Sequence, residues 1–182
     1  HDRQLDKESI DAHAYTVSLL NTNNNSSNYL MDQSSFYENY FIGEKKNWAT
    51  KVRSYKTHLQ KDIYLGIDLL LFVINDQLKF ELHIAPNKST KRIKLKYEGL
   101  EKLTIIDKDI LCKTSVNLVK EHQPYAYQII NGEEIEVICN YKLNQRVLSF
   151  DFPEGYDLNY ELIIDPTLEF STYSGFINTT NS

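Results

Sequence analysis

Two aspartates are the side chains of this sequence that could carry out hydrolytic chemistry. Asp68 follows Gly66-Ile67 and Asp165 precedes Pro166, so each borders an apolar run. Two carboxyl groups about 5–9.5 Å apart in a cleft would suit glycoside hydrolysis. An aspartate at a strand edge, however, more often accepts hydrogen bonds from the N–H groups of a turn. A glycoside hydrolase fragment is therefore the least favoured of three hypotheses, and we predict no catalytic residue.

Metal and cofactor chemistry has little support in the residue spacing. Asp107 and Asp109 flank a lysine and could bind Ca²⁺, but no further acidic residue follows at the spacing of a calcium loop, so we expect a structural turn. The sequence contains no CxxC pair, phosphate loop, Gly-x-Ser-x-Gly turn or glycine-rich dinucleotide turn. Zinc-type spacing is also absent among the histidines His13, His58, His83 and His122. We expect neither a metal nor a cofactor.

Tyrosines are the strongest candidates for binding. The chain contains 13 of them, and several fall near the ends of expected strands or in loops. Exposed rings at such places could stack on sugars or pack against a partner protein. Tyr125 and Tyr127 occupy alternating strand positions, where aromatic residues usually pack into a core, so we expect these two to be buried. The predicted ligand-binding residues are Tyr29, Tyr37, Tyr40, Tyr156 and Tyr160.

Composition narrows the class of partner. The 182 residues carry a net charge of −5, and the basic residues are scattered, which disfavours nucleic acid and membrane surfaces as partners. The longest apolar run, residues 69–74, is far shorter than the roughly 20 residues that span a bilayer. Cys112 and Cys139 lie in alternating apolar runs, so we expect free, buried thiols rather than a disulfide.

The elements that must position these residues are short strands. Apolar and polar residues alternate over residues 77–84, and the nearly continuous apolar run 67–74 precedes them, which predicts a hairpin whose first strand is covered on both faces. Asn131-Gly132 predicts a type I′ turn between strands 125–130 and 134–143. Further strands are expected at residues 14–20, 37–42, 52–59, 93–97, 103–106, 110–114, 147–152 and 162–165. The expected fold is an all-β, antiparallel, β-sandwich-like domain of many short strands joined by hairpins.

Three segments are expected along the chain. Residues 1–36 form an amino-terminal lead-in with a first strand and a polar loop, residues 37–166 the main β domain, and residues 167–182 a transition to a following repeat or domain. His1 is not an initiator Met, so we expect natural sequence upstream. Leu168, Phe170 and Thr172 alternate after Pro166, as in a strand that restarts in a new sheet.

A series of short motifs resembles a known bacterial domain. In order they are residues 39–43 (NYFIG), Trp48, 52–55 (VRSY), 63–69 (IYLGIDL), 78–80 (LKF), 85–86 (AP), 93–99 (IKLKYEG), 123–128 (QPYAYQ) and 163–166 (IIDP). Together they resemble the β-rich domain of unknown function that precedes SBBP-type β-propeller repeats in large bacterial secreted or cell-surface proteins. Residues 171–175 (STYSG) resemble the opening of such a repeat, except that Phe176 stands where a second Gly is usual. The resemblance implies a secreted or cell-surface location, links to gliding motility, and no established catalytic residues.

The first hypothesis for function is therefore a non-enzymatic structural or interaction module of a bacterial extracellular protein, with a role related to adhesion. Its partners would be neighbouring domains of the same polypeptide, a surface glycan or another surface protein. The alternative is a carbohydrate-binding module that uses exposed tyrosines, which requires those rings to form an exposed strip.

Overall fold

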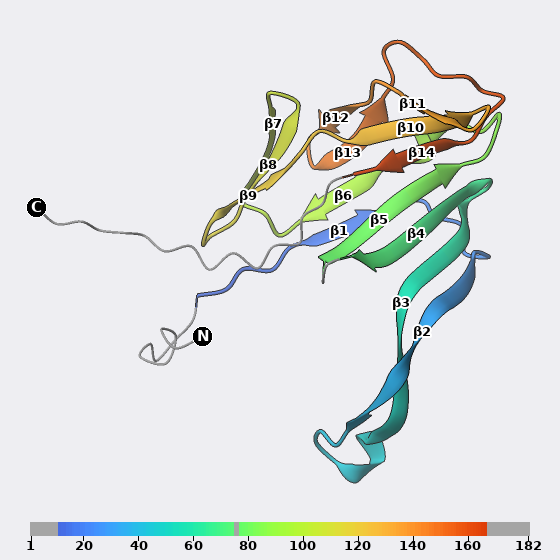
Figure 1. Ribbon diagram of the computed structural model, residues 1–182. Helices are drawn as coiled ribbons and strands as arrows, with labels where there is room; N and C mark the ends of the chain where they lie inside the picture. Colours follow the sequence, from blue (N-terminus) through green and yellow to red (C-terminus); the bar gives the residue numbers. More distant parts are fainter. Residues whose placement is uncertain (1–10, 75–76, 167–182) are drawn as a thin grey trace, which may run out of the picture.

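The computed structural model describes residues 11–74 and 77–166, which form antiparallel sheets with two short 3₁₀ helices (Figure 1). The predicted all-β class is confirmed, and the sheets do not close into a barrel. The largest sheet has seven strands in the order β11-β10-β14-β5-β4-β3-β2. Its strands are β11 (Glu133–Glu136), β10 (Tyr125–Ile130), β14 (Leu162–Asp165), β5 (Gln77–Ile84), β4 (Ile67–Ile74), β3 (Ala49–Tyr64) and β2 (Ser27–Tyr40).

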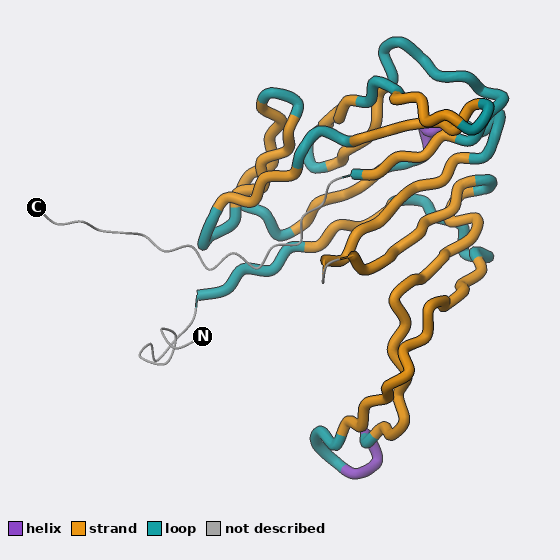
Figure 2. Tube along the Cα trace, viewed as in Figure 1, coloured by secondary structure: helices purple, strands orange, loops and turns teal. Residues whose placement is uncertain are grey.

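Two smaller sheets complete the fold. A four-stranded sheet has the order β1-β6-β13-β12, and a three-stranded sheet has the order β7-β8-β9. Their strands are β1 (Thr16–Leu19), β6 (Leu95–Glu98), β13 (Val147–Asp151), β12 (Asn140–Asn144), β7 (Lys102–Ile106), β8 (Asp109–Lys113) and β9 (Leu118–Glu121). The 3₁₀ helices are η1 (Lys45–Asn47) and η2 (Thr90–Arg92), and Figure 2 shows how loops and strands alternate along the chain.

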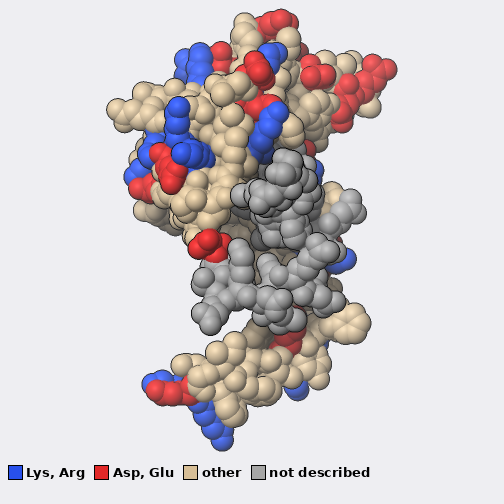
Figure 3. Space-filling model, turned by 90° about the vertical axis from the view of Figure 1, so that its left-hand side faces the viewer, with Lys and Arg blue, Asp and Glu red and all other residues tan. Residues whose placement is uncertain are grey.

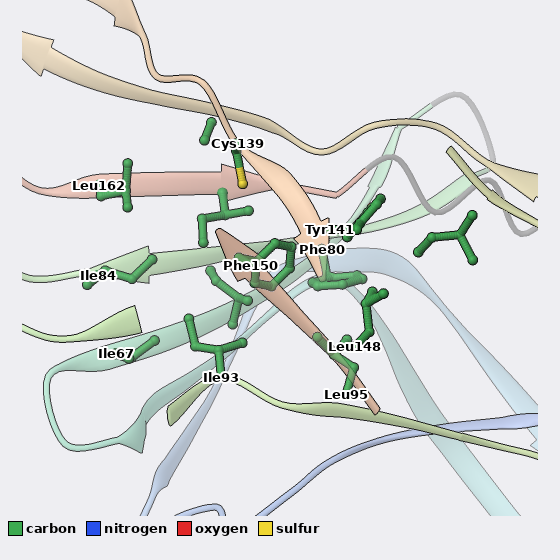
Figure 4. Packing of buried hydrophobic residues seen from close by; sticks show 14 of the residues in the cluster. Ile67, Phe80, Ile84, Ile93, Leu95, Cys139, Tyr141, Leu148, Phe150 and Leu162 are labelled. Carbon is green, nitrogen blue, oxygen red and sulfur yellow. The ribbon is translucent and has the colours of Figure 1, made fainter. Parts of the chain in front are cut away.

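The core lies where the seven-stranded sheet faces the four-stranded sheet. Alternation places Phe80, Leu82 and Ile84 of β5 on the inner side, and all three are buried. The four-stranded sheet contributes Leu95 from β6 and Leu148 from β13 among others (Figure 4). Part of one face of each of these two sheets is thereby removed from water, which is the main stabilising contribution in a fold of this type.

Local signals predicted the β4–β5 and β10–β11 hairpins correctly. β4 and β5 pair in register from Ile67↔Ile84 to Ile74↔Gln77. Asn131 and Gly132 both have positive φ, 54° and 87°, as a type I′ turn requires, and they join β10 to β11. β4 is less covered than expected, since Val73 and Ile74 at its end are exposed.

The expected strand at 134–143 is wrong, because two strands in different sheets occupy this segment. β11 pairs with β10 in the seven-stranded sheet, while β12 pairs with β13 in the four-stranded sheet. Between β11 and β12, the Val137 N–H donates to the carbonyl of Ala126 at 2.8 Å. Val137 and Cys139 are buried, and this segment connects one sheet to the other. Alternation continues through such a crossing, so it does not reveal the change of sheet.

Candidate interaction surface

The most exposed element among the described residues is a long hairpin, residues 27–61, which we call the arm. β2 and β3 pair along almost their whole length, but β4 accompanies β3 only from Thr57 onwards. Residues 49–56 of β3 therefore have β2 as their only paired neighbour among the described strands. At about 3.3 Å per residue they extend roughly 25 Å beyond the body. Figure 1 shows the arm leaving the sheet as a twisted two-stranded ribbon.

Large apolar side chains cover the arm, and most of them lie beyond the part of β3 that pairs with β4. Phe36 is 80% exposed, Ile42 73% and Trp48 44%. Nearly half of the exposed large apolar residues of the described chain lie in this one hairpin: Tyr29, Leu30, Met31, Phe36, Tyr37, Tyr40, Phe41, Ile42, Trp48, Val52 and Tyr55. Exposed apolar surface that is gathered in one place commonly marks a binding surface.

Local contacts give the free end of the arm a defined shape. The rings of Phe41 and Trp48 meet edge to face, with centroids 5.1 Å apart, and the Trp48 indole N–H donates to the Gly43 carbonyl at 3.3 Å. Arg53 lies over the ring of Tyr37 at 5.6 Å and donates from Nη1 to the Ser35 carbonyl at 3.2 Å. These contacts hold aromatic rings in place while leaving them accessible.

Two irregularities in pairing bend the arm. The register shifts between Gln33 and Tyr37 and again between Glu38 and Tyr40. Asp32 and Lys51 have positive φ, 56° and 55°, and the Lys51 N–H donates to Asn39 Oδ1 at 2.9 Å. Bulges at an outer strand increase twist and interrupt the row of free backbone groups, which limits uncontrolled strand addition.

A hollow of about 240 Å³ lies where the arm joins the sheet. Leu71 and Val73 of β4 meet Leu30 and Tyr55 of the arm around it. The complete lining is Leu30, Tyr55, Lys56, Thr57, His58, Leu71, Val73 and Leu78. The arm and the uncovered end of β4 thus form one apolar surface that continues to the base of the arm.

The arm differs in charge from the rest of the chain. Residues 27–61 contain six Lys or Arg against three Asp or Glu, a net charge of +3. Since the whole chain carries −5, the remainder carries −8. Figure 3 shows basic side chains with an acidic neighbour at the free end of the arm, at the bottom of the view, and acidic side chains interspersed with basic ones at the upper end of the body.

The strand at the opposite edge of the same sheet is acidic. All four residues of β11 are exposed, and three of them are Glu133, Glu134 and Glu136. The fourth, Ile135, is exposed together with Ile129 on the neighbouring strand β10. The Tyr125 hydroxyl donates to Glu134 Oε1 at 2.7 Å, and this bond raises the pKa of Tyr125 to about 12.

The predicted tyrosines fall into two separate groups. Tyr29, Tyr37 and Tyr40 lie on β2 and are exposed, and the Tyr40 hydroxyl donates to Glu38. Tyr156 and Tyr160 are half-buried in the loop between β13 and β14, where the Tyr156 ring packs against Phe152 with centroids 5.1 Å apart. The structure therefore gathers three of the five tyrosines on the arm and places the other two away from it.

Tyr125 and Tyr127 do not enter the core, so that expectation is wrong. Tyr125 is exposed and Tyr127 half-buried, while Ala126 and Gln128 between and after them point inward. The two rings stack on the outer face of the sheet with centroids 5.5 Å apart. Alternation identified their shared face correctly but not which face the second sheet covers.

The two candidate hydrolytic aspartates share the outer face of the seven-stranded sheet but do not adjoin. Asp68 on β4 pairs with His83 on β5, and His83 pairs with Ile163, two residues before Asp165 on β14. With strands about 4.8 Å apart, the backbones of β4 and β14 are about 10 Å apart across β5. Asp68 Oδ1 accepts from the Asp62 N–H at 2.7 Å, which is the turn role expected of such an aspartate.

His83 and its acidic neighbours form the charged part of this outer face. His83 Nε2 lies 2.9 Å from Glu81 Oε2, and Nδ1 lies 3.6 Å from Glu161 Oε1. The hydrogen bond to Glu81 is the main reason that the pKa of His83 is raised. Burial raises the pKa of Asp165. The described residues contain no group of three or more His, Cys, Asp or Glu that could hold a metal ion.

The expected turn at Asp107-Lys108-Asp109 joins β7 to β8. Asp107 and Lys108 have positive φ, and Asp109 Oδ1 accepts from the Gln123 N–H at 2.9 Å. Asp109 also pairs with Lys120 at 2.7 Å, and the hydrogen bond from Lys120 is the main reason that its pKa is lowered. The Asp109 carboxylate is thus bound by other groups of the protein, as expected of an aspartate in a structural turn.

A buried glutamate is the most unusual group of the interior. Glu121 at the end of β9 is 1% exposed and accepts from the Tyr97 hydroxyl at 2.8 Å and from Cys112 Sγ at 3.6 Å. Burial raises its pKa to about 7, although the two hydrogen bonds act in the opposite direction. Cys112 and Cys139 are both free and buried, as predicted. In this environment their thiols are poor nucleophiles, since burial raises the pKa of each.

Sequence reasoning missed the importance of Phe36, Phe41, Ile42 and Trp48. These residues lie in a segment where neighbouring positions, such as Phe36 and Tyr37, are both apolar. Such a segment has neither the strict alternation of a half-buried strand nor the composition of a polar loop, and that departure is the signal in the sequence. No helix in the described residues has the length and apolar character needed to cross a membrane.

Comparison with known proteins identifies one family. The model of a domain of unknown function, DUF7948, matches residues 1–167. No curated protein matches the chain. The solved structures likewise contain no match. Because the matched region covers most of the sequence, the chain belongs to the DUF7948 family of domains of unknown function.

Proposed function

We propose that this chain is a non-enzymatic interaction module and that the arm is the element that contacts its partner. One observation carries the proposal: the arm presents eleven large apolar side chains to solvent on a ribbon that projects from the body of the domain. Burying aromatic surface of this kind on a partner is favourable at about 25 cal/mol per Å² of apolar area, before the costs of association.

The location that best suits such a module is a bacterial secreted or cell-surface protein, in which the domain precedes repeats and has a role related to adhesion. Support comes from the motifs at residues 39–43, 63–69 and 163–166, which resemble domains in proteins of that kind. Neighbouring domains of the same polypeptide or another surface protein are the proposed partners.

A surface glycan is the second candidate partner. It is favoured by Tyr29, Tyr37 and Tyr40, because all three are exposed on the arm and aromatic rings stack well on the apolar faces of sugars. A protein partner remains the first candidate, since the aliphatic Leu30, Met31 and Ile42 on the same arm suit an apolar protein surface better.

The test compares the chain with a variant whose arm is shortened. Gln33 and Tyr55 are directly paired, so residues 34–54 can be replaced by Asn-Gly, which forms a two-residue hairpin turn. Thermal unfolding of both proteins is measured with the neighbouring domains and with a panel of soluble polysaccharides. A ligand at about 100 times its Kd adds about 2.7 kcal/mol of stability.

We expect at least one partner to raise the melting temperature of the full-length chain and not that of the shortened one. The matched control replaces Leu65 and Leu118 by Ser, two exposed residues outside the free end of the arm, and should keep the shift. Shifts that persist in the shortened variant, or their absence with every partner and with added copies of the chain itself, would contradict an arm-mediated interaction module.

A further inference from the structure

The free end of the arm, residues 36–53, exposes every one of its side chains, and the loop 41–48 joins β2 to β3 there. Three side chains of this loop are large and apolar: Phe41 is 58% exposed, Ile42 73% and Trp48 44%. The rings of Phe41 and Trp48 pack edge to face against each other. Within the part of the chain that the structure describes, these apolar groups are therefore left to solvent.

Basic residues surround the exposed apolar groups. The free end carries four basic residues against two acidic ones, a net charge of +2, and all six are exposed: Glu38, Glu44, Lys45, Lys46, Lys51 and Arg53. The Glu44 carboxylate pairs with Lys46 at 2.9 Å, and Glu38 accepts from the Tyr40 hydroxyl. The free end thus combines apolar side chains with a surplus of positive charge.

Distance separates this charge from the acidic body. The part of the ribbon without β4 extends roughly 25 Å, whereas exposed charges are largely screened beyond about 8 Å at physiological salt. The −8 carried by the chain outside the arm therefore does not cancel the field at the free end. Scattered basic residues disfavour a membrane partner for the chain as a whole, but that reasoning does not apply to a segment held this far from the acidic residues.

An anionic bilayer suits both properties of the free end. Aromatic side chains such as Trp favour the membrane–water interface, and exposed basic side chains bind anionic headgroups. A stable protein interface buries about 800 Å² on each partner, which is a large demand on the end of a two-stranded ribbon, whereas a fluid bilayer accepts a small insert. Backbone groups of the loop that have no strand partner keep the contact at the interface, because hydrocarbon cannot satisfy them.

We propose that the free end of the arm binds the surface of a bilayer that contains anionic lipid, with Phe41, Ile42 and Trp48 in the interface and Lys45 and Lys51 against the headgroups. The inference rests on the proposed function, because it names a partner for the free end of the same arm. A protein partner would contact the arm along its length and down to its base, so the two contacts are compatible.

Trp48 reports the contact directly, because it is the single Trp of the chain and lies in this segment. Vesicles of phosphatidylcholine are compared with vesicles that also contain phosphatidylglycerol, which is anionic. With the anionic vesicles, the emission of Trp48 should shift to the blue, and the protein should sediment with the lipid. Because the charges are exposed, binding should weaken about tenfold between about 0.15 M and 1 M salt.

Two arm variants separate the contribution of charge from that of apolar burial. Lys45→Gln combined with Lys51→Gln should weaken binding about twentyfold, because each basic residue near an anionic surface contributes about fivefold. Ile42→Ser should weaken binding about tenfold, because it removes an exposed aliphatic side chain that would enter the interface.

The matched controls make the same changes on the body, at exposed residues outside the arm: Lys91→Gln with Lys102→Gln, and Leu65→Ser. Both should bind like the unchanged chain. An unchanged Trp48 emission with anionic vesicles would overturn the proposal, as would equal binding to both kinds of vesicle or equal losses in the arm and control variants. If vesicles have no effect while a protein or glycan still stabilises the chain through the arm, the bilayer assignment fails and the proposed function survives.

Discussion

Replacing Glu121 by Gln should remove a large part of the dependence of stability on pH. Burial favours the protonated carboxyl group in the folded protein and raises its pKa from 4.5 to about 7. The folded state therefore binds this proton more tightly than the unfolded state does. The stabilisation is complete below about pH 4.5 and is lost as the pH rises through about 7.

The size of the effect follows from the shift in pKa. Each unit corresponds to about 1.4 kcal/mol, so a rise from 4.5 to about 7 corresponds to about 3 kcal/mol of unfolding free energy. Gln has nearly the shape of the protonated acid and can still accept a hydrogen bond from Tyr97, but it does not titrate. Relative to the unchanged chain, the variant should gain about 3 kcal/mol between pH 4.5 and pH 8.

The assay is urea unfolding followed by far-ultraviolet circular dichroism at several pH values. Trp48 is a poor probe here because it lies on the arm, away from the core. His83 also has a raised pKa, through its hydrogen bond to Glu81, and its contribution is lost as the pH rises through that pKa. This contribution is common to both proteins, so the difference between them isolates Glu121. The groups nearest to the carboxyl are Tyr97 on β6 and Cys112 on β8, and burial raises the pKa of both.

A difference in unfolding free energy that stays constant within about 0.5 kcal/mol from pH 5 to pH 8 would refute the reasoning, because it would mean that Glu121 titrates normally in the folded protein. Glu133→Gln is the matched control, because it makes the same chemical change at an exposed residue of β11. Titration of the Glu121 carboxyl carbon by NMR should give a midpoint well above that of an exposed glutamate.

Three further predictions concern the body of the domain. Gln128 is 2% exposed, donates to the Asp157 carbonyl at 2.7 Å and accepts from the Asp157 N–H at 2.9 Å, so Gln128→Ala should cost about 2 kcal/mol in chemical unfolding by leaving partly buried backbone groups of the loop unpaired. Cys112 and Cys139 should react with a thiol reagent only as fast as the protein unfolds, and fast labelling of the native state would contradict their burial. Gly66 has φ of +76° and an added Cβ would meet the Lys88 side chain at 2.5 Å, so Gly66→Ala should lower stability by about 1–2 kcal/mol, and an unchanged melting temperature would show that the turn relaxes.

Much of the fold is already present in local sequence patterns. The alternation at residues 77–84 and the Asn131-Gly132 turn predict the β4–β5 and β10–β11 hairpins, because strand faces and turn type depend on neighbouring residues alone. The same local rule predicts that Cys112 and Cys139 lie on apolar faces. It also groups Tyr125 with Tyr127 on one face, yet it does not say whether that face is covered.

Pairing between segments far apart in the chain decided which strand faces are buried and which sheet edges stay open. Residues 118–121 place Val119 and Glu121 on one face, but the core is reached only because β9 pairs with β8 and brings Glu121 beside Tyr97. Residues 27–61 form an exposed arm because β4 ends its pairing with β3 at Thr57. Alternation is a property of a few consecutive residues, and it therefore establishes strands and their two faces. Which face is buried, and which edge stays open, depends on contacts between residues far apart in the chain, and those arise only in the folded molecule.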